Sequence, residues 1–187
     1  RLGFGVRYVV PRLPFGNVVV NSDWAYLQKS RSTLAPANLP PTLNDGLYAN
    51  GAARWRGTTN VAWRRGDWSG ALAAYYVGET HDAGATTTAA VYESLGRPSY
   101  ITPFFTAGST IYRRVIDPTL SFNATLAYRF RDTAPALLRR TRVQVGVINL
   151  NDEEPPLAAS EGFGYDASVN QNLLAGRTWT IEFTRTF

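Results

Sequence analysis

Between Leu120 and Arg131 the sequence places an apolar side chain at every second position, and this alternation constrains the fold more than any other feature. The apolar set is Leu120, Phe122, Ala124, Leu126, Tyr128 and Phe130. Alternate residues of a β-strand point to opposite faces, whereas a helix would scatter the same residues around its circumference. The segment is therefore predicted to be a strand whose two faces meet different surroundings.

The same period of two recurs along the chain. Six further segments show it: residues 3–10, 17–29, 53–64, 68–78, 142–149 and 178–187. Each has about the ten residues that a β-strand needs to cross a bilayer. The polar faces carry Thr, Asn, Gln and Arg rather than Lys and Glu. We therefore predict an all-β fold of about seven antiparallel strands.

The predicted connections alternate between short and long. The short ones are residues 11–16, 64–67 and 132–141, and the long ones are residues 30–52, 79–117 and 150–176. Up-and-down membrane barrels have short turns at one end and long loops at the other. A soluble β-sandwich also has alternating strands, but it has no reason to sort its connections in this way. The pattern favours an antiparallel up-and-down transmembrane β-barrel.

Aromatic residues fall at the predicted strand ends. Trp63 and Trp68 flank a short connection, and Trp55 and Trp179 lie at the opposite ends of their strands. Amphipathic rings are favoured at the boundary between lipid and water. The spacing therefore predicts one aromatic belt at each end of the strands.

The amino-acid composition excludes several classes of protein. The chain has no Cys and one His, which excludes a disulfide framework and a cysteine zinc site. No stretch approaches the roughly 20 apolar residues of a membrane helix. Eighteen of the 19 basic residues are Arg, a skew typical of genomic base composition, so the net charge of +5 does not indicate a nucleic-acid partner. Because Met is absent even at position 1, we expect Arg1 to begin a processed or excised piece.

Two polar motifs could carry chemistry. Glu79, His81 and Asp82 are three potential metal ligands within four residues, and Glu153 and Glu154 are adjacent carboxylates. A single loop His with two acidic neighbours is more often hydrated, and adjacent carboxylates on an extended chain point apart. We therefore expect no catalytic, cofactor-binding or metal-binding residues, and no enzyme activity.

From about residue 50 to the end, a series of motifs stands in a fixed order. It comprises Arg54-Trp55-Arg56-Gly57, Trp63-Arg64-Arg65-Gly66-Asp67-Trp68-Ser69, Leu126-Ala127-Tyr128-Arg129-Phe130, Val145-Gly146-Val147-Ile148-Asn149-Leu150, Asp152-Glu153-Glu154-Pro155-Pro156, Gly164-Tyr165-Asp166, Gly176-Arg177-Thr178 and a terminal Phe187. In this order they resemble the C-terminal part of the β-barrel of TonB-dependent outer-membrane receptors. The chain departs from the family pattern at Asn151, which is expected to matter little in a loop, and at Arg185, which weakens the match to the assembly signal.

The resemblance implies a fold, a location and a function. Residues 1–187 would form about seven strands of a larger, 22-stranded barrel in the bacterial outer membrane, and the plug domain would lie outside this chain. The receptor would import a scarce solute, such as a metal chelate, a siderophore or an oligosaccharide, with TonB-coupled energy. Its partners would be outer-membrane lipid, its own plug domain, the TonB system and an extracellular small-molecule ligand, with no cofactor.

Residues 79–117 are where we expect contact with the solute, because aromatic rings can stack on it and arginines can donate hydrogen bonds to it. The candidates are Tyr92, Arg97, Tyr100, Phe104, Phe105, Tyr112 and Arg113. The alternative is a loop that packs on its own aromatic residues.

A further set of polar residues is expected to face the hydrated interior of the barrel and contact the plug. It consists of Arg54, Arg56, Asn60, Asn123, Arg129, Arg142, Gln144 and Glu182. Two other functions remain open: a small stand-alone outer-membrane barrel with an adhesive or structural role, and a secreted β-sandwich binding module.

Overall fold

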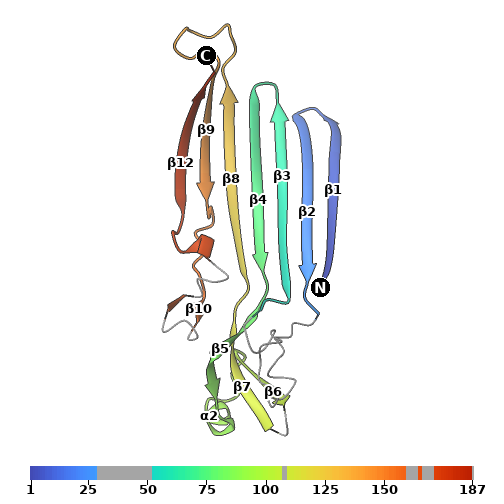
Figure 1. Cartoon of the computed structure of the whole chain (residues 1–187), viewed down its shortest axis with the longest axis vertical. Coiled ribbons are helices and arrows are strands. Elements are labelled where there is room, and N and C mark those ends of the chain that lie inside the picture. Colours follow the sequence, from blue (N-terminus) through green and yellow to red (C-terminus); the bar gives the residue numbers. More distant parts are fainter. Residues whose placement is uncertain (29–51, 107–108, 159–163, 166–170, 187) are drawn as a thin grey trace.

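The computed structural model describes residues 1–28, 52–106, 109–158, 164–165 and 171–186. Its main element is a seven-stranded antiparallel sheet with the order β1-β2-β3-β4-β8-β9-β12 (Figure 1). The strands are β1 (Leu2–Leu13), β2 (Gly16–Tyr26), β3 (Trp55–Arg65), β4 (Trp68–Val77), β8 (Thr119–Arg129), β9 (Thr141–Ile148) and β12 (Thr178–Arg185). The seven segments with period-two patterns correspond to these strands, which confirms the all-β antiparallel prediction.

The first turn is shorter than predicted. β1 continues past Val10 to Leu13, and its register with β2 shifts between these two residues. Pro11 lies within the shift, as expected for a residue that cannot donate a ladder hydrogen bond and is confined to edge strands and bulges. Gly16 then begins β2 with φ at 125°, and a Cβ on it would lie 2.5 Å from the Arg64 carbonyl oxygen. Only glycine fits this turn.

The short connections lie together at one end of the sheet, and the described parts of the long ones lie at the other (Figure 1). Strands β1 and β12 form the two edges, on opposite sides of the sheet, and within the described residues they do not pair with each other. The sheet is therefore open.

The segment 79–117, predicted as a long loop, is largely ordered into secondary structure. It forms an antiparallel sheet with the order β5-β7-β6, made of β5 (Thr80–Thr87), β6 (Ile101–Thr106) and β7 (Ser109–Ile116). A short helix, α2 (Ala89–Ser94), joins β5 to β6 and begins at the N-cap Thr88, whose side chain accepts a hydrogen bond from the Val91 amide. We call residues 79–117 the extension; it continues the long-connection end of the main sheet (Figure 1).

The connection between β9 and β12 holds three smaller elements. These are the strand pair β10 (Leu157–Ala158) and β11 (Gly164–Tyr165), and the 3₁₀ helix η2 (Gln171–Leu173). The long connection 30–52 lies outside the described residues, except for Ala52.

Few apolar side chains are buried. Among the described residues they are Ala53, Ile101, Ile116, Ala127, Val147, Ala158 and Leu173. Several belong to the extension or to η2, and no two-layered core runs along the seven strands. The single α-helix described has six residues, so no described helix is long enough to span a membrane.

Candidate functional site

The strand registers gather most of the large apolar side chains of the seven strands on one face, which we call the apolar face; Val9, Val19, Tyr75, Val77 and Ile148 lie on the other. The apolar face carries Phe4, Val6 and Tyr8 of β1, Val18, Val20 and Trp24 of β2, Trp55, Val61 and Trp63 of β3, Trp68, Leu72 and Tyr76 of β4, Phe122, Leu126 and Tyr128 of β8, Val143, Val145 and Val147 of β9, and Trp179, Ile181 and Phe183 of β12. Directly opposed residues share a face, so the alternation seen in each segment becomes a continuous surface. This surface is exposed: Leu126 is 47% and Phe183 71% accessible.

Aromatic rings gather at both ends of the apolar face. At the short-turn end, the rings of Trp68 and Tyr128 are 4.7 Å apart, and Tyr128 meets Phe130 at 4.9 Å. At the other end, Trp55 lies 4.7 Å from Tyr26 and 6.4 Å from Phe4. The described strand ends thus carry the two predicted aromatic groups; Phe187 lies outside the described residues.

Two hydroxyl groups interrupt the apolar face, and both have partners. Ser22 and Thr59 lie directly opposite each other on β2 and β3, and their hydroxyl oxygens are 2.7 Å apart. The Trp24 indole Nε1 also donates a hydrogen bond to the Ser22 hydroxyl, at 3.0 Å. An unpaired polar group would be costly in an apolar medium, and this chain of hydrogen bonds avoids that cost.

The opposite face of the sheet, the polar face, carries mostly small and polar side chains. They include Gly5, Arg7, Asn17, Asn21, Asp23, Arg56, Thr58, Asn60, Arg64, Ser69, Ala71, Ala73, Ser121, Asn123, Thr125, Arg129, Arg142, Gln144, Thr180, Glu182 and Thr184. Of the residues predicted to share a hydrated face, only Arg54 differs. It precedes β3, and its Nη1 donates to the Tyr26 hydroxyl at 3.3 Å.

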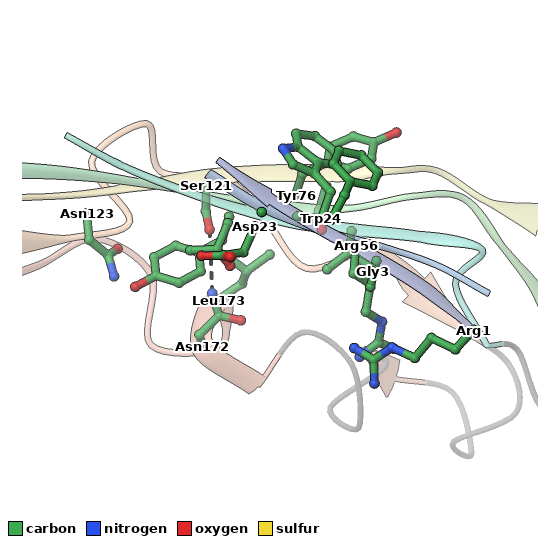
Figure 2. A pocket seen from close by; sticks show the side chains of 18 residues that line it. Arg1, Gly3, Asp23, Trp24, Arg56, Tyr76, Ser121, Asn123, Asn172 and Leu173 are labelled. Carbon is green, nitrogen blue, oxygen red and sulfur yellow. Dashed lines mark hydrogen bonds between the residues drawn. The ribbon is translucent and has the colours of Figure 1, made fainter. Parts of the chain in front are cut away.

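A groove of about 1010 Å³ runs along the polar face at the long-connection end. Asp23, Arg56 and Ser121 line it from the sheet, and Asn172 and Leu173 of η2 close one side. Figure 2 shows these residues on one side of the sheet and the rings of Trp24 and Tyr76 on the other. The Asn172 amide donates to the Ser121 hydroxyl at 3.5 Å, and Leu173 is almost fully buried. The groove therefore presents both charges and hydrogen-bonding groups.

The extension brings some of the predicted solute-contacting residues together. The rings of Tyr92 on α2 and Tyr112 on β7 lie 4.9 Å apart. Arg97 follows α2 with φ at 58°, and its Nε donates to the Glu93 carboxylate at 2.8 Å. That bond raises the pKa of the Arg97 guanidinium, with a smaller contribution from the two tyrosines. Tyr92, Arg97 and Tyr112 thus form one group, in which Arg97 is exposed and the two tyrosines are half-buried.

The remaining candidates are dispersed. Tyr100 precedes β6 and is exposed, while Arg113 neighbours Tyr112 along β7 and so lies on the other face of that sheet. Arg113 is only 7% exposed. Phe104 and Phe105 belong to β6 and oppose Ile111 and Thr110, and the positions of their side chains lie outside the described structure. The seven candidates do not form a single site.

In the polar motif at the start of the extension, Glu79 is exposed, His81 is half-buried and Asp82 is buried, close to the buried Arg113 of β7. Asp82 is 1% and Arg113 7% exposed. Burial lowers the pKa of Arg113, and the Asp82 carboxylate opposes that shift. Burial also lowers the pKa of His81; Glu79 opposes this shift, whereas Arg113 and Arg54 add to it. Within the described ranges, no three His, Asp or Glu side chains are grouped as metal ligands would be.

The turn after β9 contains structural residues that the sequence did not reveal. Asn149 is 1% exposed and has φ at 55°; its side chain donates to the Glu153 carbonyl and accepts from the Glu153 amide, both at 2.9 Å. The backbone amide of Asn149 donates a hydrogen bond to the side-chain oxygen of Asn123 at 2.9 Å. The Asp152 carboxylate accepts hydrogen bonds from the Arg177 amide, at 3.0 Å, and from its guanidinium, at 3.1 Å.

The expectation that Asn151 matters little is wrong. β9 ends at Ile148, yet the Asn151 side chain donates to the Leu120 carbonyl at 2.8 Å and accepts from the Phe122 amide at 3.1 Å. Its amide group therefore takes the place of a backbone unit and extends the ladder along β8. The spacing Asn149-x-Asn151-Asp152 was the available signal, because Asn and Asp side chains commonly bond to backbone groups in turns.

Comparisons with protein-family models, with curated proteins and with solved structures gave no match to this chain.

Proposed function

We propose that this chain is an arc of the wall of a transmembrane β-barrel in the bacterial outer membrane, and that the barrel is a TonB-dependent receptor. One observation carries the proposal: the seven strands expose most of their large apolar side chains on one side and place mainly small or polar side chains on the other. Lipid on one side and water on the other account for this distribution. A β-sandwich would bury the apolar face, which is exposed here.

The spacing of the aromatic groups fits a bilayer. On β4, Trp68 and Tyr76 are eight residues apart on the same face. At about 3.3 Å per residue this is about 26 Å along the strand, and a tilt of about 40° reduces it to about 20 Å of height. The apolar band of an outer-membrane barrel is about 25 Å tall with aromatic girdles at both boundaries. The two aromatic groups would then lie near the two headgroup layers.

An open sheet cannot remain in lipid, because its edge strands would carry unpaired backbone groups. In the proposed assembly β1 and β12 pair with further strands of a larger barrel, which the family resemblance puts at 22 strands. The polar face would line the hydrated interior, and its groove near Asp23, Arg56 and Ser121 would receive part of the plug domain.

The proposed activity is import without covalent chemistry. A scarce solute, such as a metal chelate, a siderophore or an oligosaccharide, would bind at the long-connection end, and the TonB system would supply energy. The group of Tyr92, Arg97 and Tyr112 supports this role, since partly exposed aromatic faces and a guanidinium held by Glu93 can stack on a polar solute and donate hydrogen bonds to it.

A matched pair of substitutions on β8 tests the assignment of the faces. Leu126→Arg places a charge on the apolar face, and Thr125→Arg places the same charge on the polar face one residue away. Near the middle of a bilayer an arginine costs about 2–4 kcal/mol. We expect Leu126→Arg to block assembly into outer membranes, measured by fractionation and heat-modifiable migration, and Thr125→Arg to assemble normally. Equal behaviour of the two variants would refute the proposal.

A further inference from the structure

A second groove, of about 830 Å³, lies on the polar face at the short-turn end. Five arginines and two aspartates line it: Arg64, Arg129, Arg131, Arg140, Arg142, Asp67 and Asp132. Its charged lining therefore has a net charge of +3. Small residues of the β3–β4 hairpin, Ala62, Gly66, Ser69 and Gly70, line it as well and leave room between the long side chains.

The two aspartates are already engaged. The Arg131 guanidinium pairs with Asp67, and the Arg140 Nε donates to Asp132 at 2.9 Å. Arg64, Arg129 and Arg142 are exposed, and none of them forms an ion pair with a carboxylate of the described residues. Three guanidinium groups in this groove therefore lack a compensating charge.

Two of these three arginines are directly opposed. Arg129 is the last residue of β8 and pairs in register with Arg142 near the start of β9, so both side chains leave the same face of the sheet. Like charges in such a cross-strand pair are destabilising. The Arg142 Nη2 donates to the Gln144 side chain at 2.7 Å, which holds its guanidinium over the sheet but supplies no charge.

We infer that this groove binds a small solute with a phosphate group, held between Arg129, Arg142 and Arg64. A guanidinium donates paired hydrogen bonds to phosphate oxygens, and a phosphate monoester carries about −1.5 to −2 charge near pH 7, which suits a lining with an excess of positive charge. Val19, Trp63, Trp68 and Phe130 also line the groove. The three arginines, however, leave the polar face of the sheet, opposite the exposed apolar face, so we assign the phosphate to a dissolved solute. This site requires only the folded sheet and is independent of the transport proposal.

Titration of the detergent-held protein with inorganic phosphate at constant ionic strength tests this site, with binding measured by calorimetry. We expect one saturable site for phosphate. The affinity should be at least tenfold weaker in the double variant that combines Arg129→Gln and Arg142→Gln. Arg139→Gln is the matched control, because Arg139 lies in the same turn but does not line the groove, and it should bind as the unmodified protein does.

A stability measurement accompanies the titration. At low ionic strength without phosphate, the double variant should melt at a higher temperature than the unmodified protein, because the opposed charges are gone. Phosphate should raise the melting temperature of the unmodified protein and leave that of the variant unchanged. The inference is overturned by phosphate affinity that is equal in the two proteins, by no saturable binding to the unmodified protein, or by binding of a glutamate-rich peptide in place of phosphate.

Discussion

The main sheet and the extension use side chains in opposite ways. In the sheet, large apolar residues such as Trp179 and Ile181 are more than 60% exposed, and polar residues occupy the other face. In the extension, Ile101 and Ile116 are buried as in an ordinary water-soluble fold, together with Asp82 and Arg113. On the function proposed above, the sheet would face an apolar solvent on one side and the extension would lie in water.

The largest effect is expected at Asn149, in the turn through which the chain leaves the main sheet after β9. Asn149→Ala removes the buried side chain that pairs with the Glu153 amide and carbonyl, and it places Ala at positive φ. Lost hydrogen bonds and backbone strain together should cost about 2–4 kcal/mol. Chemical unfolding in detergent measures this cost.

Asn172→Ala is the control for Asn149→Ala, since Asn172 is exposed and its described side-chain contact is one bond of 3.5 Å. Its unfolding midpoint should barely change. A similar loss of stability in the two variants would show that the buried hydrogen bonds of Asn149 do not stabilise this turn.

A smaller effect is expected within the sheet, at Gly57. A Cβ there would lie 2.5 Å from ring carbons of Trp24, so Gly57→Ala must move the indole away from Tyr76, whose ring now lies 5.6 Å from it. Such overpacking typically costs about 1–3 kcal/mol. Gly3→Ala is the control, because the nearest atom to its added Cβ is 3.8 Å away. Tryptophan fluorescence and melting in detergent should change for Gly57→Ala and remain unchanged for Gly3→Ala.

The smallest predicted effect is a dependence of stability on pH that is present in the extension and absent from the main sheet. Burial holds the pKa of His81 below its usual 6.5 in the folded extension. The unfolded segment then binds a proton more readily than the folded one, so stability is full above pH 6.5 and declines as the pH falls toward the folded pKa. Hydrogen exchange of the extension amides should accelerate between pH 7.5 and 5.5 beyond the intrinsic pH effect, while the amides of β3 and β4 follow that effect alone.

His81→Gln should abolish this extra pH dependence in the extension. Persistence of the pH dependence in that variant would assign it to another group and would remove the contrast between the two regions.

The sequence predicted the structure best in strands whose two faces meet different surroundings. Alternation at Leu120–Arg131 predicted both the strand and its faces, because lipid or core on one side and water on the other select different residues at successive positions. The extension lacks this signal: its β5–β7 register shifts between His81 and Thr86, which breaks the period of two. Asn151 was missed for a related reason, since a side chain that replaces backbone in a ladder leaves no periodic pattern.

Site-directed spin labelling along β8 tests the central claim most directly. Labels placed singly at residues 120–128 in membrane-embedded protein would be scored for collisions with oxygen, which dissolves in lipid, and with a water-soluble nickel complex. The account predicts strict alternation, with oxygen favoured at 120, 122, 124, 126 and 128 and nickel at the positions between them. Uniform accessibility along the strand, or protection of the even-numbered positions from both reagents, would contradict it.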